Sequence, residues 1–273
     1  MNVLNLLGNS PLSDLAKQAG SQVTNAVYTA AQNTGVDFSY LLQQANVESS
    51  FDTDAQAKTS SARGLYQFLN RTWLDMVDRH GDKYGIDTNQ SKQDLLSLRD
   101  DPELSSAMAA EFASENKRFL ENTWGGDIGS TELYLAHFMG AGGAASFLKA
   151  RDENPLQPAA DLFERAANAN KNIFFDRNTG RAKTMEEVYQ NFAKKFAVSD
   201  EKAMQQPALN NAPYERNSTV PLHTFKESIA LRQRTEGLNN QAVLNIFSTL
   251  SIPSHNKMFQ MNTLDFVSLF KTI

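Results

Sequence analysis

The sequence predicts an all-α fold for the main part of the chain. From about Ser21 to Phe196, apolar residues recur at spacings of three and four, and runs of alternating apolar and polar residues are scarce. Capping residues and prolines precede these apolar segments, and glycines follow several of them. The 273 residues suffice for one substantial domain and an appendage, and a core of that size needs no disulfide or metal.

Each expected helix has a start or stop signal in the sequence. Asp, Asn and Thr side chains can accept hydrogen bonds from the first helical amides, and proline is favoured in the first turn. Glycine tolerates the left-handed backbone that follows many helices. In order, helices are expected over 38–49 after Asp37, from Asn70 or Thr72 to Gly81, over 102–121 after Asp101, over 131–139 before Gly140, around Phe147, over 159–168, and from Thr184 through Phe192.

The composition changes after Val198. Residues 199–222 are polar and rich in proline and asparagine, which is typical of a linker, while residues 223–273 regain apolar side chains. We therefore expect an N-terminal segment over 1–20, a domain over 21–198, a linker over 199–222, and a helical or partly disordered interaction segment over 223–273.

Charge and composition exclude several classes of function. The net charge is -5 and no basic cluster stands out, so neither nucleic acid nor an anionic membrane is expected as a partner. No stretch approaches the roughly 18 to 20 apolar residues that span a bilayer. The chain has no cysteine, and its four histidines lack paired metal-ligand spacing, so we expect no metal and no cofactor. The first 20 residues lack a basic region and a cleavage pattern, so no signal peptide is recognisable.

Glu48 ends the apolar stripe of the helix over 38–49. At a helical period its side chain projects at the margin of the face formed by Phe38, Leu41, Leu42 and Ala45. One interpretation is a glutamate that reaches water at a helix end. The other is an acid held partly out of water beside an open loop, which favours the protonated carboxyl group. Ser60, Ser61 and Gly64 leave room in that loop, and Tyr66 and Gln67 add a stacking face and an amide.

The order and spacing of these residues are similar to those of a known protein family. The stretches Glu48-Ser49-Ser50-Phe51, Asp54-Ala55, Ala62-Arg63-Gly64-Leu65-Tyr66-Gln67-Phe68 and Thr72-Trp73 resemble the soluble lytic transglycosylase family, with its Glu-Ser-x-Phe and Gly-Leu-Met-Gln signature. The resemblance implies a lysozyme-like domain related to goose-type lysozyme. It also implies a peptidoglycan lytic transglycosylase that cleaves the MurNAc-GlcNAc β-1,4 bond to a 1,6-anhydromuramyl product, in the periplasm or cell envelope. Glu48 would be the sole catalytic acid and base.

Other site residues follow from the resemblance, with departures from the family pattern. The loop after Glu48 is longer by one residue, so either Ser60 or Ser61 matches the substrate-binding serine. Histidine replaces tyrosine in the family's Ala-Tyr-Asn-Ala-Gly stretch, where it either orients Glu48 or is a hydrogen-bonded core residue. The residues expected to bind substrate are Ser60, Ser61, Tyr66, Gln67, His137, Phe138 and Tyr189. Asp52 and Asp54 are expected to cap the loop, and Glu111 and Glu115 to occupy a solvated helix face.

Two alternatives to the transglycosylase stay open. A lysozyme-like hydrolase would use the same glutamate but would add water to the product. The chain could also be an assembly component of a flagellum, a secretion system or a phage tail, with a weak or altered site. Residues 223–273 would then bind the partner.

Overall fold

The computed structural model describes residue 3, residue 7 and residues 10–203, with side chains to residue 196. Within these residues the fold is helical, and only isolated β-bridges occur, so the prediction of an all-α fold is confirmed. None of the described helices is both long and apolar enough to cross a bilayer. The expected interaction segment over 223–273 and nearly all of the linker lie outside the described residues.

The helices expected from residue 38 onward are present, while Pro11–Thr34 and Lys92–Ser97 were not expected as separate helices. In chain order the helices are α2 (Pro11–Thr34), α3 (Phe38–Ser49), α4 (Asn70–His80), η1 (Gly81–Tyr84), α5 (Lys92–Ser97), η2 (Leu98–Asp100), α6 (Pro102–Thr123), α7 (Ser130–Met139), α8 (Ala141–Glu153), α9 (Ala159–Leu162), α10 (Glu164–Ala169), α11 (Lys171–Phe174) and α12 (Met185–Ala203). Asp37 accepts a hydrogen bond of 3.0 Å from the amide of Tyr40, and Asp101 accepts one of 2.9 Å from Glu103. Both predicted caps are therefore confirmed.

Two expected domain boundaries lie inside helices. α2 begins at Pro11, after the cap Ser10, and passes residue 20 with a kink at Gly20, whose φ is 77°. The first helix named from the sequence starts at residue 38, so the whole of α2 was not predicted. At the other end, α12 continues beyond residue 198 to Ala203. The helix expected over 159–168 is divided into α9 and α10 at Phe163, where ψ is 45°.

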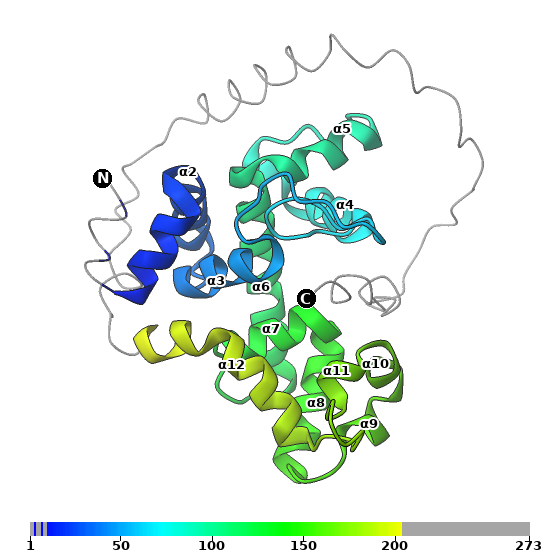
Figure 1. Cartoon of the computed structure of the whole chain (residues 1–273). Coiled ribbons are helices and arrows are strands. Elements are labelled where there is room, and N and C mark those ends of the chain that lie inside the picture. The colour runs from blue at the N-terminus through cyan, green and yellow to red at the C-terminus, as the bar shows by residue number, and fades with distance from the viewer. Residues whose placement is uncertain (1–2, 4–6, 8–9, 204–273) are drawn as a thin grey trace, which may run out of the picture.

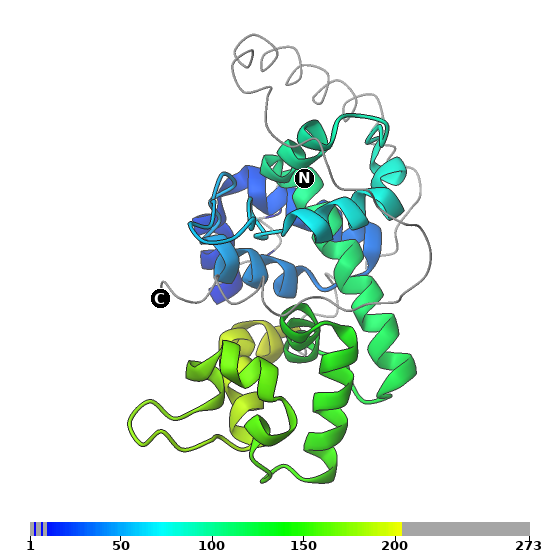
Figure 2. The same cartoon turned by 90° about the vertical axis from the view of Figure 1, so that its right-hand side faces the viewer.

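The helices form two groups around α6 and α7 (Figures 1 and 2). α2 and α4 pack against α6, and α3 packs against α2. In Figure 2 the long α6 runs down from this first group toward α8 and the remaining helices. α12 crosses back from the second group and packs against both α7 and α3. The end of α3, and with it Glu48, therefore lies where the two groups meet.

Aromatic rings hold α12 against α3 and α7. The ring of Phe196 stacks on Tyr40 at a centroid distance of 5.6 Å and lies 4.7 Å from the ring of Tyr134. One turn earlier, Phe192 lies 5.0 Å from Phe138. Such pairs contribute about 0.5 to 1.5 kcal/mol each beyond the burial of apolar area. The position of α12 beside α3 is thus fixed by side chains that are themselves buried.

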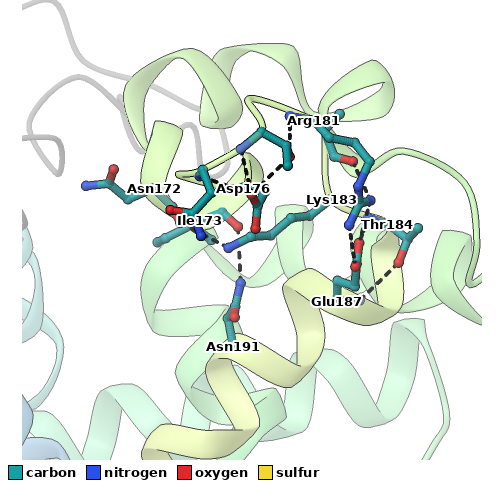
Figure 3. A network of polar contacts seen from close by, with 11 residues as sticks. Asn172, Ile173, Asp176, Arg181, Lys183, Thr184, Glu187 and Asn191 are labelled. Carbon is teal, nitrogen blue, oxygen red and sulfur yellow. Dashed lines mark hydrogen bonds and ion pairs between the residues drawn. The ribbon is translucent and has the colours of Figure 1, made fainter.

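Polar contacts fix the first turn of α12 (Figure 3). The amide of Thr184 donates to Glu187 at 2.8 Å, and the amide of Glu187 donates to the hydroxyl of Thr184 at 3.2 Å. This reciprocal pair is a capping box, so the predicted cap at Thr184 is confirmed. Hydrogen bonds from Arg181 and from the Thr184 amide lower the pKa of Glu187 to about 2. Asn191, on the next turns of α12, donates to the carbonyl of Ile173 at 3.2 Å.

Glu111 does not occupy a solvated face, so that prediction is wrong. Glu111 is 6% exposed on α6. Its carboxylate accepts hydrogen bonds from Lys83 and, at 2.7 Å, from Tyr84. His80 Nδ1 lies 3.6 Å from Glu111, while its Nε2 lies 2.8 Å from Glu115. The helical pattern of α6 could not reveal these contacts, because the partners come from α4 and η1. Both glutamates therefore join α6 to the chain around residue 80.

Candidate active site

Glu48 lies in the last turn of α3 with its side chain turned into the protein. The residue that follows the helix, Ser50, has a left-handed backbone with φ 53° and closes α3. The side chain of Glu48 is 1% exposed, and its Oε1 atom makes no hydrogen bond. We expected a carboxyl group only partly out of water. It is buried because α12 packs against α3 and His137 reaches Glu48 from α7, which the periodicity of a single helix does not show.

His137 is an ionisable partner of Glu48. Its Nε2 atom lies 3.2 Å from Oε1 of Glu48, in a geometry that falls short of a hydrogen bond. On the other side of the ring, Nε2 of Gln44 lies 3.3 Å from Nδ1 of His137. The imidazole stacks on Tyr134 at a centroid distance of 5.7 Å and meets the edge of Phe112 at 6.4 Å. The structure thus brings His137 to Glu48, and the ring is held on several sides.

Two phenols and one ammonium group complete the surroundings of Glu48. Burial raises the pKa of Tyr134 well above its usual value, and the charge of Glu48 raises it further. The same two causes raise the pKa of Tyr40. Burial lowers the pKa of Lys195, and the charge of Glu48 partly opposes this effect. The Lys195 ammonium also lies 5.6 Å from the centre of the Tyr134 ring. Glu48 therefore faces neutral phenols and a nearby cation.

The loop after α3 is stabilised by its own polar groups. Nε2 of Gln67 donates to the carbonyl of Ala55 at 3.0 Å and to that of Gly64 at 2.9 Å, while Gln67 itself has a φ of 47°. Gly64 has a φ of 80°, and a Cβ atom there would lie 2.1 Å from the carbonyl oxygen of Arg99. The glycine is required by both its backbone conformation and this close approach.

The two candidate serines lie on this loop and accept hydrogen bonds from nearby amides. The Ser60 hydroxyl accepts from the amide of Ala62 at 3.2 Å. The Ser61 hydroxyl accepts from the amide of Asn70, at the start of α4, at 3.3 Å. Ser61 is exposed and Ser60 is half-buried, and each hydroxyl retains its own proton for a further hydrogen bond.

The aromatic candidates take different positions. Tyr66 is 1% exposed, and its hydroxyl donates to the carbonyl of Leu41 at 3.1 Å. Phe138 is also buried, within the aromatic cluster under α12. Tyr189 is half-buried, and its hydroxyl donates to Glu132 at 2.5 Å. In this structure Tyr66 and Phe138 belong to the hydrophobic core, and Tyr189 lies in a separate polar cluster on α12 and α7.

A comparison with protein families decides what kind of domain holds Glu48. Residues 25–143 match the family model of the transglycosylase SLT domain. Residues 25–143 thus form a transglycosylase SLT domain. Members of the SLT family are lytic transglycosylases that act on peptidoglycan. The match includes α3, the loop after it, α6 and α7, so Glu48, Gln44, Tyr134 and His137 all belong to the SLT domain.

Four of the residues described around Glu48 were not predicted from the sequence, namely Tyr40, Gln44, Tyr134 and Lys195. Gln44 precedes Glu48 by one helical turn and shares its face, so the helical period could have indicated it. Tyr134 precedes His137 by one turn on α7 in the same way. Lys195 lies on α12, beyond the segment that matches the SLT domain, and nothing in its local sequence indicates a contact with Glu48.

Proposed function

We propose that this protein is a peptidoglycan lytic transglycosylase that cleaves the β-1,4 bond between MurNAc and GlcNAc, with Glu48 as both acid and base. One observation carries the proposal. Within an SLT domain, the Glu48 carboxyl group is buried, and its Oε1 atom makes no hydrogen bond while it faces His137. A buried carboxyl oxygen without a hydrogen bond costs stability, and such costs are typical of sites shaped for a reaction.

In the first step Glu48 acts as an acid. Its carboxyl proton passes to the glycosidic oxygen, the bond from that oxygen to C1 of MurNAc breaks, and GlcNAc leaves with a free 4-hydroxyl group. Positive charge then develops at C1 and its ring oxygen, as in other glycoside cleavages. The acetamido group of the same MurNAc can stabilise this charge, so the step needs no nucleophile from the protein.

In the second step Glu48 acts as a base. Its carboxylate accepts the proton of the MurNAc 6-hydroxyl group as the hydroxyl oxygen bonds to C1, which gives the 1,6-anhydro ring. The proton returns to Glu48, so the cycle closes without water or a cofactor. Use of one group as acid and then base is common in glycosidases.

The structure supports a mechanism with one carboxylate from this part of the chain. Asp52 and Asp54 are exposed, and Asp52 accepts a hydrogen bond of 3.0 Å from the amide of Asp54, as expected for residues that cap a loop. The buried phenols of Tyr40 and Tyr134 have raised pKa values and therefore stay neutral. Within the described residues, the two phenols near Glu48 can orient it or stabilise charge. They supply no second carboxylate.

Substrate binding is proposed for the loop beside α3. Ser60 or Ser61 and the Oε1 atom of Gln67 would hold the N-acetyl groups, since Nε2 of Gln67 already donates to Ala55 and Gly64. Tyr66 and Phe138 shape the site from within the core. The Glu48 side chain is 1% exposed, so side chains around it must move before a glycan reaches the carboxyl group.

The test uses purified peptidoglycan and mass spectrometry of the released muropeptides. Wild type should release anhydromuropeptides, and Glu48→Gln should release none while it keeps the helical circular dichroism of the wild type. Glu121→Gln is the matched control, because Glu121 is half exposed on α6 and should retain full activity. Products that carry an added water would favour the hydrolase. Undiminished activity of Glu48→Gln would end the proposal.

The proposed substrate assigns the protein to the cell envelope or periplasm. A partner in a flagellum, secretion system or phage tail would bind residues 223–273, which lie outside the described residues. That docking segment stays a prediction. It is tested by comparing a chain that ends after Ala203 with the full chain, both for muropeptide release and for binding to candidate partners.

A further inference from the structure

We propose that Gln44 is a positioning residue that fixes the tautomer of His137, with its Nε2–H bond directed at Glu48. The geometry of the three side chains carries this inference, and only its consequence for activity depends on the proposed function. Gln44 and Glu48 share one face of α3, and His137 reaches between them from α7.

The direction of the contacts sets the tautomer. Nε2 of Gln44 is a donor and lies 3.3 Å from Nδ1 of His137, so Nδ1 is the acceptor and carries no proton. The single ring proton is then on Nε2, which lies 3.2 Å from Oε1 of Glu48. Since Oε1 has no other hydrogen bond, a small rotation of His137 would complete one there. Gln44 thus acts on Glu48 through the histidine ring.

The surroundings keep the ring in this orientation. Tyr134 stacks on one side of His137 and Phe112 contacts it edge-on, so rotation of the ring would displace buried side chains. Ionisable groups that face His137 include Glu48 from α3 and Tyr134 from α7. Lys195 from α12 lies over the Tyr134 ring. Phe112 from α6 is uncharged. Gln44 contacts Nδ1 of the ring and is 3% exposed.

The alternative arrangement has a different chemical result. If the Gln44 amide were turned over, its Oε1 atom would accept a proton from Nδ1. The ring would then be either the opposite tautomer, with a bare Nε2 against Glu48, or a charged imidazolium. An imidazolium favours the carboxylate form of Glu48 and would hinder its action as an acid. The contact of Gln44 Nε2 with Nδ1 is the arrangement that leaves an N–H bond directed at Glu48.

Nitrogen NMR of the full chain tests the tautomer directly. The ring ¹⁵N shifts distinguish a protonated from a bare nitrogen, and His137→Gln assigns the signal among the four histidines. At pH 7 the wild type should show Nε2 protonated and Nδ1 bare. Gln44→Glu places an acceptor at Nδ1 and should convert His137 to the imidazolium. Gln44→Met keeps the length of the side chain without a donor and should give a mixture of tautomers.

Gln43→Met is the matched control. Gln43 is the neighbouring glutamine on α3, and its Nε2 donates to the carbonyl of Lys195 at 3.0 Å rather than to His137. This variant should leave the His137 signal unchanged. A wild-type ring with Nδ1 protonated, or a Gln44→Glu ring identical to the wild type, would overturn the proposal.

Activity measurements separate this inference from the proposed function. Gln44→Glu should release anhydromuropeptides about tenfold more slowly at pH 7, as expected when a group that orients a catalytic partner is altered. The pH profile of its activity should also differ from that of the wild type, because a charged ring would lie beside Glu48. If even the wild type releases no product, the proposed function fails while the NMR result still decides the role of Gln44. An altered ring with unchanged rates and pH profile would show that Gln44 does not position a catalytic group.

Discussion

The hydroxyl of Ser49 lies 2.8 Å from the carbonyl oxygen of Leu65, to which it donates a hydrogen bond. The residue directly after Glu48 therefore holds the loop that carries Gly64 and Gln67. The same hydroxyl also lies 3.2 Å from the carbonyl of Ala45, within α3. A single side chain thus links the end of α3 to the loop that is proposed to bind the glycan.

Ser49→Ala should lower the free energy of unfolding by about 1 kcal/mol, because it removes this partly buried hydrogen bond. Thermal or urea unfolding measures the change. Ser146→Ala is the control, since Ser146 is exposed on α8 and bonds only to the carbonyl of Gly142 in its own helix. That change should stay within about 0.5 kcal/mol. Equal effects of the two substitutions would contradict the role of Ser49.

Gly64→Ala should be strongly destabilising. A Cβ atom at this position would lie 2.1 Å from the carbonyl oxygen of Arg99, and the backbone φ of 80° is unfavourable for alanine. We expect a loss of more than about 3 kcal/mol, measured by urea unfolding. Gly142→Ala, in α8 with no atom within 4 Å of the new Cβ, should instead be neutral or stabilise by about 0.5 kcal/mol. A tolerated Gly64→Ala would refute this description of the loop.

Tyr66→Phe should lower stability by about 1 kcal/mol, because it removes the hydrogen bond from a fully buried hydroxyl group to Leu41. Differential scanning calorimetry of the variant would show a lower Tm. Tyr28→Phe serves as the comparison, since Tyr28 is half-buried and its hydroxyl makes no hydrogen bond within the described residues. A Tm unchanged by Tyr66→Phe would mean that the hydroxyl group contributes nothing to the core.

Glu111 should make stability depend on pH in the acidic range. Burial alone would raise the pKa of Glu111, but hydrogen bonds from Lys83 and Tyr84 and the charges of Lys83 and His80 outweigh burial and lower it. A lowered pKa in the folded state gives stability that is fully present above the unfolded value of about 4.3 and is lost as pH falls through the folded value.

The corresponding measurement is urea unfolding of the wild type and Glu111→Gln between about pH 6 and pH 3. The wild type should be more stable at pH 6, and the difference should shrink as the pH falls below about 4.3. A difference that stays constant over this range would show that the ionised Glu111 does not stabilise the fold.

The sequence predicts the local features of the fold well. The start of α3 at Phe38 and the cap at Asp37 depend on neighbouring residues, so the printed sequence suffices to place them. The helix α2 was not predicted, and its pattern is broken at Gly20, where the backbone φ is 77°. The burial of Glu111 was not predicted because its partners follow α4, which packs on α6 only in the folded chain.

In the candidate site too, the sequence indicated some residues and not others. Glu48 could be identified from its position on a helix and from the motif around it, and the resemblance placed His137 beside it. The contact of His137 with Gln44 joins α7 to α3, and the local sequence of neither helix indicates it. The core position of Tyr66 was equally hidden, because a buried tyrosine and a sugar-binding tyrosine look alike in sequence.

The arrangement of α12 bears on how the protein should be produced. Residues 25–143 match the SLT domain, yet Phe196 packs on Tyr40 and Tyr134 from well beyond that segment. An expression clone trimmed to the matching segment would leave those aromatic rings bare to solvent and would invite aggregation. A recombinant fragment for crystallisation should therefore extend through Ala203.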